Sequence, residues 1–240
     1  MRHGNGKLGI VLLALSTLAY GSGTENTALG ARIEACPGMA EWQAAMKAAH
    51  AQHAVSRKPA RKPKLRAALL AMGKADQEAR LAFTTAGRPP TPEELRQMDT
   101  TDASHQQRIR TLIRRHGFPR ATDVGTDGSN AAFLLVQHAP NPTFQVEALA
   151  AMEPLLALKE VSAADYALLF DRVQMGQGRP QRYGSQFSTR DGINVLYPVE
   201  NPQTLDARRA AMDLPPMSAY ACTIETAYGI EVDLSALKTP

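Results

Sequence analysis

Residues 163–197 read AADYALLFDRVQMGQGRPQRYGSQFSTRDGINVLY, and the spacing of apolar residues changes within this stretch. Before Gly178 the apolar residues recur every three or four positions, as on the buried face of a helix. After Gly178 the segments QRYGSQF and INVLYPV resemble strands, and Asp191-Gly192 between them is typical of a hairpin turn. The stretch therefore predicts an α+β fold in which a helix leads into a β-hairpin.

The rest of the chain is predicted to be mainly helical. Hydrophobic residues make up 44% of the sequence but aromatic residues only 5%, which favours a helix-rich domain over a β-sandwich. A capping box of Thr91, Pro92 and Glu94 precedes another helix, and FPRATDVGTDGS, residues 118–129, is predicted as a turn-rich loop. The expected helices cover roughly residues 37–55, 64–84, 101–116, 129–138, 142–159, 162–176 and 201–212. We expect a mainly α-helical single domain with one β-hairpin packed near the candidate site, and we assign no structure to residues 216–240.

The first 21 residues have the anatomy of a signal peptide. Arg2 and Lys7 precede an apolar run at residues 8–20, which is shorter than the roughly 20 residues that span a bilayer. Small residues around Gly21 offer a cleavage site. We expect cleavage, a periplasmic or secreted location and no membrane span in the mature chain. An uncleaved anchor and a mis-assigned start are the alternatives.

The charge balance disfavours a nucleic-acid partner. The chain has 27 basic and 23 acidic residues, and removing residues 1–21 takes away Arg2 and Lys7 and no acid, which leaves 25 against 23. The densest basic run, RKPARKPKLR at residues 57–66, contains prolines and is predicted to be an exposed linker. A phosphate-binding patch is the alternative.

The two cysteines, Cys36 and Cys222, are an even number in a chain predicted to be exported. This favours a disulfide that ties the start of the mature chain to its end, with two separate thiols as the alternative. Neither cysteine has a His or Cys neighbour at ligand spacing, so no metal site is predicted. We find no phosphate loop and no nucleophile elbow, and we predict no cofactor.

Polar residues gather where the helix meets the hairpin. Asp171 shares a helical face with Leu168 and Met175, so its carboxylate is drawn toward the core, where an unpaired charge is costly. His138 ends an apolar helix and also lies at the edge of the core. Because a His and an Asp in one cleft can perform general acid–base chemistry, we predict His138 as the base and Asp171 as the group that orients it.

Further polar residues around this pair are candidates for binding a substrate. On an ideal strand Gln181 and Tyr183 share one face and Gln186 the other, so a bulge at Gly184 is needed to bring both glutamines to one pocket. Gln137, next to His138, completes this set. The alternative is a buried network that only satisfies its own hydrogen bonds.

Two other pairs of charged residues are predicted to lie on the surface. Asp76 and Arg80 are four residues apart on a predicted helix, which is typical of a surface ion pair. Arg208 and Arg209 are predicted to be solvated, with an anion site as the alternative.

Short motifs follow one another in order along the chain. They are DQEAR (76–80), HGFP (116–119), VG (124–125), LLVQHA (134–139), FQ (144–145), ALLFDRV (167–173), GRPQRYGSQF (178–187) and DARRAAMDLPPMSAY (206–220). This series resembles an uncharacterised bacterial family, domain of unknown function 6624, over roughly residues 65–220. Ser185 stands where that family more often has Thr, and His105 where Asn is expected.

The resemblance implies a shared signature but no activity. Its polar members are Asp76, Gln77, Arg80, Gln137, His138, Asp171, Arg172, Gln181, Tyr183 and Gln186. Polar residues at helix ends and on a hairpin suit a cleft better than a core. We therefore expect either an exported hydrolase or a non-catalytic periplasmic binding or structural domain, acting on a small molecule or an envelope component.

The expected organisation has four parts. Residues 1–21 are a signal peptide and residues 22–64 a helical extension with the basic, proline-rich linker. Residues 65–220 are the family-like α+β domain, and residues 221–240 are a C-terminal tail.

Overall fold

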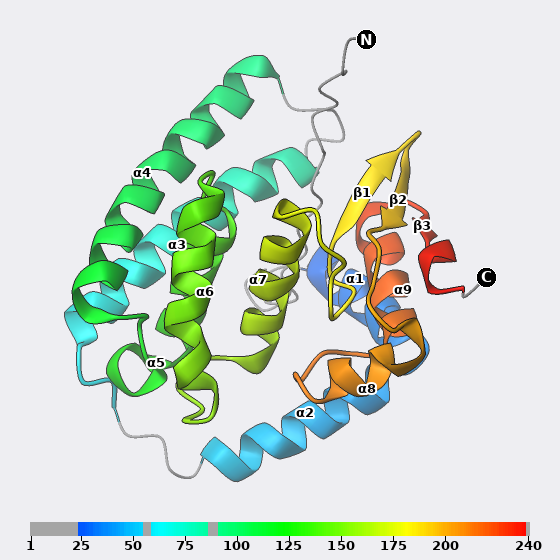
Figure 1. The fold of residues 1–240 in the computed structure, drawn as a ribbon, viewed down its shortest axis with the longest axis horizontal. Coiled ribbons are helices and arrows are strands. Elements are labelled where there is room, and N and C mark those ends of the chain that lie inside the picture. The colour runs from blue at the N-terminus through cyan, green and yellow to red at the C-terminus, as the bar shows by residue number, and fades with distance from the viewer. Residues whose placement is uncertain (1–23, 55–58, 86–90, 239–240) are drawn as a thin grey trace. The chain divides into compact units, whose positions relative to one another are not determined.

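The computed structural model describes residues 24–54, 59–85 and 91–238, and this part of the chain is mainly helical with one small sheet, which confirms the α+β class (Figure 1). The predicted signal peptide lies outside the described residues. The helices are α1 (Thr24–Glu34), α2 (Met39–Ala54), α3 (Pro63–Thr85), α4 (Pro92–His116), α5 (Ala121–Gln137), α6 (Pro142–Leu156), α7 (Ala163–Gly176), α8 (Leu205–Ala210) and α9 (Met217–Tyr228). The strands are β1 (Phe187–Arg190), β2 (Ile193–Leu196) and β3 (Val232–Asp233). Among the described helices, none has the length and apolar character needed to cross a membrane.

The chain divides into two compact units. Unit 1 consists of residues 1–50 and 177–240, and unit 2 of residues 51–176. Unit 2 therefore contains α3 to α7, and unit 1 contains the sheet, α1, α8, α9 and most of α2.

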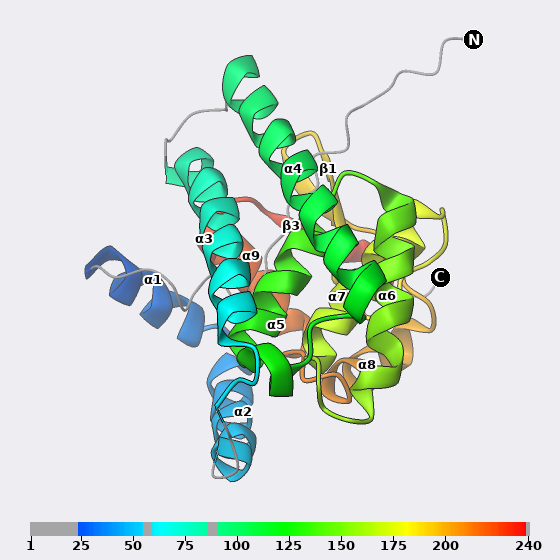
Figure 2. The ribbon, with the colours of Figure 1, turned by 90° about the vertical axis from the view of Figure 1, so that its left-hand side faces the viewer.

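Helices α3 and α5 of unit 2 lie side by side and run in the same direction (Figure 2). Lys62 Nζ lies 2.7 Å from Asp123 Oδ2, and one turn later Arg66 Nε donates to Asp127 Oδ1 at 2.9 Å. Lys62 and Arg66 are exposed, as predicted for the basic run, and their ion pairs with Asp123 and Asp127 also join the start of α3 to α5.

A glycine sets the distance between these two helices. A Cβ placed on Gly73 would lie 3.0 Å from the Cβ of Ala131, closer than side chains normally approach. Gly73 therefore allows α3 and α5 to touch along their backbones. Asp76 follows Gly73 by one turn, and His138 follows Ala131 by two turns, so the close approach brings these two polar residues together.

The predicted loop at residues 118–129 is wrong, since α5 already begins at Ala121. Its glycines and aspartates are used inside the helix. Gly125 has φ 76° and ψ 161°, a conformation that breaks the helical run and that glycine adopts without strain. Just after this break, Asp127 Oδ1 accepts from the backbone N–H of Gly128 at 2.8 Å.

The capping box at Thr91 is confirmed, but a separate helix at 101–116 is not found. Glu94 N donates to Thr91 Oγ1 at 3.2 Å, and Thr91 N donates to Glu94 Oε2 at 2.7 Å. Helix α4 then runs unbroken to His116. Thr100 and Thr101 fit inside it because their hydroxyls donate to the carbonyls one turn earlier, each at 2.9 Å.

The hairpin of unit 1 is confirmed. Phe187 pairs with Leu196 and Arg190 with Ile193, and the turn contains Asp191 and Gly192, both with positive φ. The predicted first strand, QRYGSQF at residues 181–187, is wrong except for Phe187, because regular pairing starts there and β1 continues to Arg190. The sequence did not predict that β3 adds to β2 in parallel, nor that α9 occupies residues 217–228.

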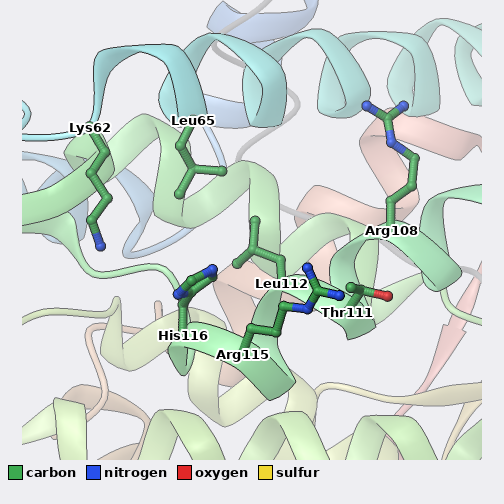
Figure 3. A pocket seen from close by; sticks show the side chains of 7 residues that line it. All are labelled: Lys62, Leu65, Arg108, Thr111, Leu112, Arg115 and His116. Atoms are coloured by element: carbon green, nitrogen blue, oxygen red, sulfur yellow. The ribbon is translucent and has the colours of Figure 1, made fainter.

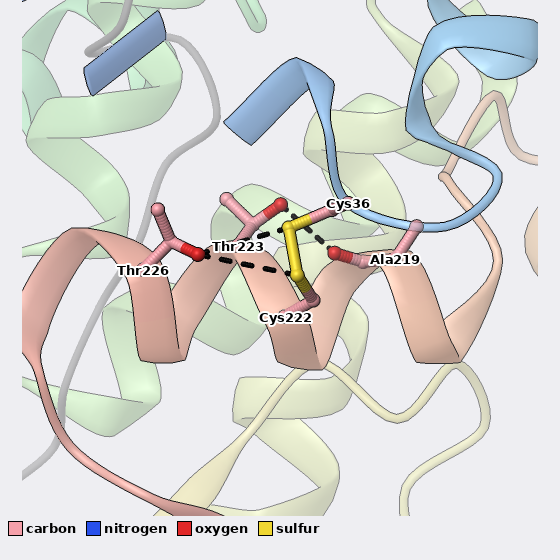
Figure 4. The surroundings of a disulfide bond; sticks show 5 residues. All are labelled: Cys36, Ala219, Cys222, Thr223 and Thr226. Carbon is pink, nitrogen blue, oxygen red and sulfur yellow. Dashed lines mark hydrogen bonds between the residues drawn. A yellow bond between two sulfur atoms is a disulfide. The ribbon is translucent and has the colours of Figure 1, made fainter. Parts of the chain in front are cut away.

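The predicted disulfide between Cys36 and Cys222 is confirmed, with their Cα atoms 5.8 Å apart. The bridge joins the turn after α1 to α9, and the Thr226 hydroxyl lies 3.8 and 3.9 Å from its two sulfur atoms (Figure 4). Ile33 and Met39 are almost fully buried around it. Two chain segments separated by 186 residues are thus held in one small core.

Candidate functional site

The His138 cluster consists of Asp76, Arg80, Asp102 and His138, from three helices of unit 2. Nδ1 of His138, the C-cap of α5, lies 2.8 Å from Asp76 Oδ2 on α3. Arg80 Nη2, one turn beyond Asp76, lies 3.2 Å from Asp76 Oδ1 and 2.8 and 2.9 Å from the two oxygens of Asp102 on α4. Arg80 therefore links the two carboxylates.

The prediction that Asp76 and Arg80 form a surface pair is half right. The ion pair is present, but the Asp76 side chain is only 1% exposed and that of Arg80 24%. The amide of Gln77 adds a donor to Asp76 Oδ2 at 2.8 Å. Oδ2 therefore has two hydrogen-bond partners, Gln77 and His138, whereas Oδ1 is enclosed and has only the ion pair with Arg80.

Burial and neighbouring charges set the ionisation of the cluster. Burial opposes the charge on Asp76, but the hydrogen bond and charge of His138, followed by the charge of Arg80, outweigh it and lower the pKa of this carboxyl. Burial lowers the pKa of His138; Asp76 opposes this effect, and the charges of Arg80 and Arg172 add to it. At neutral pH the cluster therefore holds an ionised Asp76 beside a neutral imidazole.

These states decide which nitrogen of His138 carries the proton. Arg80 Nε also approaches His138 Nδ1, at 2.9 Å, and a ring nitrogen cannot accept from Arg80 while it donates to Asp76. Because an ionised carboxylate can only accept, the Asp76 contact assigns the proton to Nδ1. Nε2 then has a free lone pair, and it makes no hydrogen bond to any residue that the structure describes.

Asp102 was not predicted from the sequence. Burial raises the pKa of its carboxyl and the Arg80 hydrogen bond only partly offsets this. Asp102 lies one turn before His105 on α4, and both lie half-buried or deeper. Burial lowers the pKa of His105, against the charges of Asp76 and Asp102, so His105 stands at the edge of the same cluster. The i, i+3, i+7 spacing of Asp102, His105 and Ile109 was a usable signal.

The remaining predicted residues of unit 2 are buried on α5 and α7. Asp171 and Gln137 are fully buried. Arg172 stands next to Asp171, and its charge contributes to lowering the pKa of His138. Asp76, not Asp171, contacts the Nδ1 of His138.

In unit 1 the amide of Gln181 fastens a loop to the hairpin. Its Nε2 donates to the carbonyls of Gln186 and Tyr197 at 3.0 and 2.8 Å, and its Oε1 accepts from Gln186 N at 2.8 Å. The Gln186 side chain donates to Ser185 Oγ at 3.0 Å, and Tyr183 is buried. The amide group of Gln181 is therefore occupied by backbone. Gly184 has φ 65° but precedes β1, so the predicted bulge within a strand is not found.

Of the two arginines of α8, Arg209 is buried and Arg208 is half-buried. Arg209 is fully buried, donates to the carbonyls of Pro215 and Tyr183 at 2.6 Å each, and lies over the ring of Tyr220. Arg208 donates from Nε to the carbonyl of Arg182 at 2.8 Å. The prediction of a solvated side chain is wrong for Arg209, because its donors are used by backbone carbonyls.

A separate open pocket of about 330 Å³ lies between the start of α3 and the end of α4 (Figure 3). Its lining residues are Lys62, Leu65, Arg108, Thr111, Leu112, Arg115 and His116. The basic residues are exposed, and Lys62 is paired with Asp123. No member of the His138 cluster lines it. In the described part of the chain, no three His, Cys, Asp or Glu side chains are grouped so that they could hold a metal ion.

The comparisons with known proteins give one positive result. Residues 63–233 match the family described as "Family of unknown function (DUF6624)". The chain belongs to DUF6624. The match starts at the first residue of α3 and includes both the His138 cluster and the Gln181 loop. No curated protein and no solved structure matches this DUF6624 chain.

Proposed function

We propose that this DUF6624 protein is an exported hydrolase in which His138 is the general base and Asp76 orients it. One observation carries the proposal: Asp76 Oδ2 lies 2.8 Å from His138 Nδ1, while Nε2 has no hydrogen-bond partner among the described residues. The side chain of His138 is 6% exposed. Nε2 is not among the fully enclosed polar atoms that lack a partner, so the exposed part of the ring includes this nitrogen. A neutral imidazole held by one nitrogen, with the other free, is the arrangement that general-base catalysis uses.

The chemistry follows from this tautomer. Nε2 takes a proton from a water molecule, and the resulting hydroxide adds to the electrophilic centre of the substrate. The imidazolium that forms is stabilised by the ionised Asp76. When the bond to the leaving group breaks, the proton on Nε2 passes to that group and the neutral imidazole returns.

Arg80 and Asp102 keep Asp76 in place. The positive charge of Arg80 lies between two carboxylates that would otherwise repel each other, and it restrains the Asp76 side chain beside His138. Asp171, predicted from the sequence for the orienting role, remains a proposed member of the site through its burial beside Arg172. The inclusion of Gln181, Tyr183 and Gln186 in the same site stays a prediction.

Export is part of the proposal. It is supported by the basic, apolar and small-residue order of residues 1–21 and by the disulfide between Cys36 and Cys222, since disulfides persist in oxidising compartments.

The second candidate is a binding domain without catalysis. The observation that favours it is the second contact to His138 Nδ1, from Arg80 Nε at 2.9 Å. If that contact held the proton on Nε2, the ring would be a hydrogen-bond donor to a ligand and not a base.

The test is hydrolysis of a panel of chromogenic carboxylic esters, amides and phosphoesters by the purified mature chain. His138→Gln should lower the rate about 10²- to 10⁴-fold, the usual contribution of a general base, with an unchanged circular dichroism spectrum. Arg115→Gln, in the separate basic pocket, is the matched control and should keep the rate. The wild-type rate should rise with pH to a plateau, with a midpoint below 6.5. A panel on which the wild type and His138→Gln behave alike would leave the binding domain as the better account.

A further inference from the structure

Arg172 on α7 has hydrogen-bond donors that nothing in the described chain uses. Its Nε and Nη2 atoms are both enclosed, and neither has a hydrogen-bond partner. No ion pair to Arg172 is found within residues 24–54, 59–85 and 91–238. An enclosed guanidinium without an anion is costly, because the desolvation of the charge is not compensated.

The two unused donors lie on the same edge of the guanidinium. Nε–H and the neighbouring Nη2–H point in nearly parallel directions, and their spacing matches the two oxygens of a carboxylate or of a phosphate. The side chain therefore offers a complete bidentate fork for one oxyanion.

The electrostatics agree with this reading. Burial lowers the pKa of Arg172 to about 9, and the charge of Arg80 adds to the effect. Arg80 is already shared between Asp76 and Asp102, whereas Arg172 has no such partner. A bound anion would offset both the burial and the repulsion between the two arginines.

The position is next to the proposed base. The charge of Arg172 acts on the imidazole of His138, and α7 packs against α5, which carries that ring. Gln137, the residue before His138, is fully buried, and both its amide nitrogen and its amide oxygen lack a partner. The C-terminal end of α5 therefore has the proposed base, His138, next to the Gln137 amide, whose hydrogen-bond donor and acceptor are both unused.

We propose that Arg172 binds an oxyanion, a carboxylate or a phosphate, through its Nε and Nη2, and so fixes an anionic substrate beside His138. The inference rests on the proposed function for the reacting centre, but the binding itself needs no turnover. Gln137 recognises a hydrogen-bonding group next to the anion, and an amide fits because it has one donor and one acceptor.

The experiment is calorimetric titration of the mature chain at constant ionic strength with acetate, with inorganic phosphate and with neutral acetamide. The wild type should bind one of the two anions saturably and acetamide more weakly. The anion that binds more tightly identifies the class, carboxylate or phosphate.

Two variants and one spectroscopic signal locate the site. Arg172→Gln should weaken the anion at least about tenfold, since one charge-assisted hydrogen bond changes affinity by that factor or more, and Arg115→Gln should leave it unchanged. When the anion is added to the wild type, the ¹⁵Nε–¹H resonance of Arg172 should shift with the same midpoint concentration as the calorimetric titration. This signal keeps the test valid if Arg172→Gln does not fold.

Any of three results would overturn the oxyanion site. They are no saturable anion binding, an Arg172 resonance that does not shift when the anion is added, and loss of binding in Arg115→Gln. If no hydrolysis is found but anion binding depends on Arg172, the hydrolase proposal fails and the oxyanion site stands.

Discussion

Replacing Gly73 by Ala tests whether the contact between α3 and α5 positions the His138 cluster. The added Cβ would lie 3.0 Å from Ala131 Cβ and 3.5 Å from Ala131 Cα. Ordinary contacts begin near 3.4 Å, so the helices must separate by a few tenths of an ångström. Overpacking of this kind costs about 1–3 kcal/mol, and the better helix propensity of Ala returns roughly 1 kcal/mol.

The expected net loss of stability in unit 2 is therefore about 1 kcal/mol. Gly30→Ala is the matched control, because Gly30 is also inside a helix, α1, but a Cβ there meets nothing within 4 Å. This control should gain roughly 0.5–1 kcal/mol from propensity alone.

Native-state hydrogen exchange measures the change in stability of unit 2 caused by Gly73→Ala and that of unit 1 caused by Gly30→Ala. Amides of α3 and α5 should exchange faster in Gly73→Ala, and amides of α1 should exchange more slowly in Gly30→Ala. The hydrolytic rate should fall only in Gly73→Ala, because Asp76 is one turn from the substitution. If Gly73→Ala stabilises α3 as Gly30→Ala stabilises α1, the close packing does not set the geometry of the cluster.

Three further predictions concern stability. Burial raises the pKa of Asp165 to about 7, against the hydrogen bond from Asn130, so the folded state binds more protons than the unfolded state between about pH 4 and 7 and loses stability as pH rises through that window. In urea titrations, the unfolding free energy of Asp165→Asn should therefore rise relative to that of the wild type from pH 4 to 7. The rise should be at most about 4 kcal/mol, at 1.4 kcal/mol per pKa unit. A difference between the two proteins that does not change with pH would refute this. Arg209→Met leaves buried carbonyls without donors and should lower the unfolding free energy by about 3 kcal/mol in the same assay, whereas a loss under 1 kcal/mol would show that these hydrogen bonds contribute little. Replacing Cys36 and Cys222 by Ser opens a loop of 186 residues and should lower the melting temperature sharply, since the chain-entropy model gives on the order of 5 kcal/mol; an unchanged melting temperature would contradict it.

The sequence predicted those elements whose signals are local. The capping box at Thr91, the turn at Asp191-Gly192 and the end of α5 at Gln137 each depend on a few neighbouring residues, and each is found. The loop expected at residues 118–129 fails for the opposite reason. Gly and Asp are common in turns, but here Gly125 forms a kink inside a helix, and Asp127 accepts a hydrogen bond from Arg66, a residue 61 positions away.

The candidate site shows the same limit. His138 was predicted because it ends an apolar helix, and its involvement needs no knowledge of distant contacts. Its partner did not follow from the sequence, because the parallel packing of α3 on α5 decides that Asp76 reaches Nδ1. Asp102 was missed since its role depends on Arg80 bridging two helices. Periodicity gives the face of a helix but not the register between helices.

The central claim is that His138 is neutral at pH 7 with its proton on Nδ1, and side-chain ¹⁵N–¹H correlation spectroscopy tests it directly. The mature chain is recorded from pH 5 to 8, and His138→Gln assigns the signal. We predict a protonated Nδ1, an unprotonated Nε2 and a titration midpoint below 6.5. In Asp76→Asn the preference for the Nδ1 proton should weaken. A wild-type spectrum with the proton on Nε2, or a midpoint above 6.5, would contradict His138 as a general base held by Asp76.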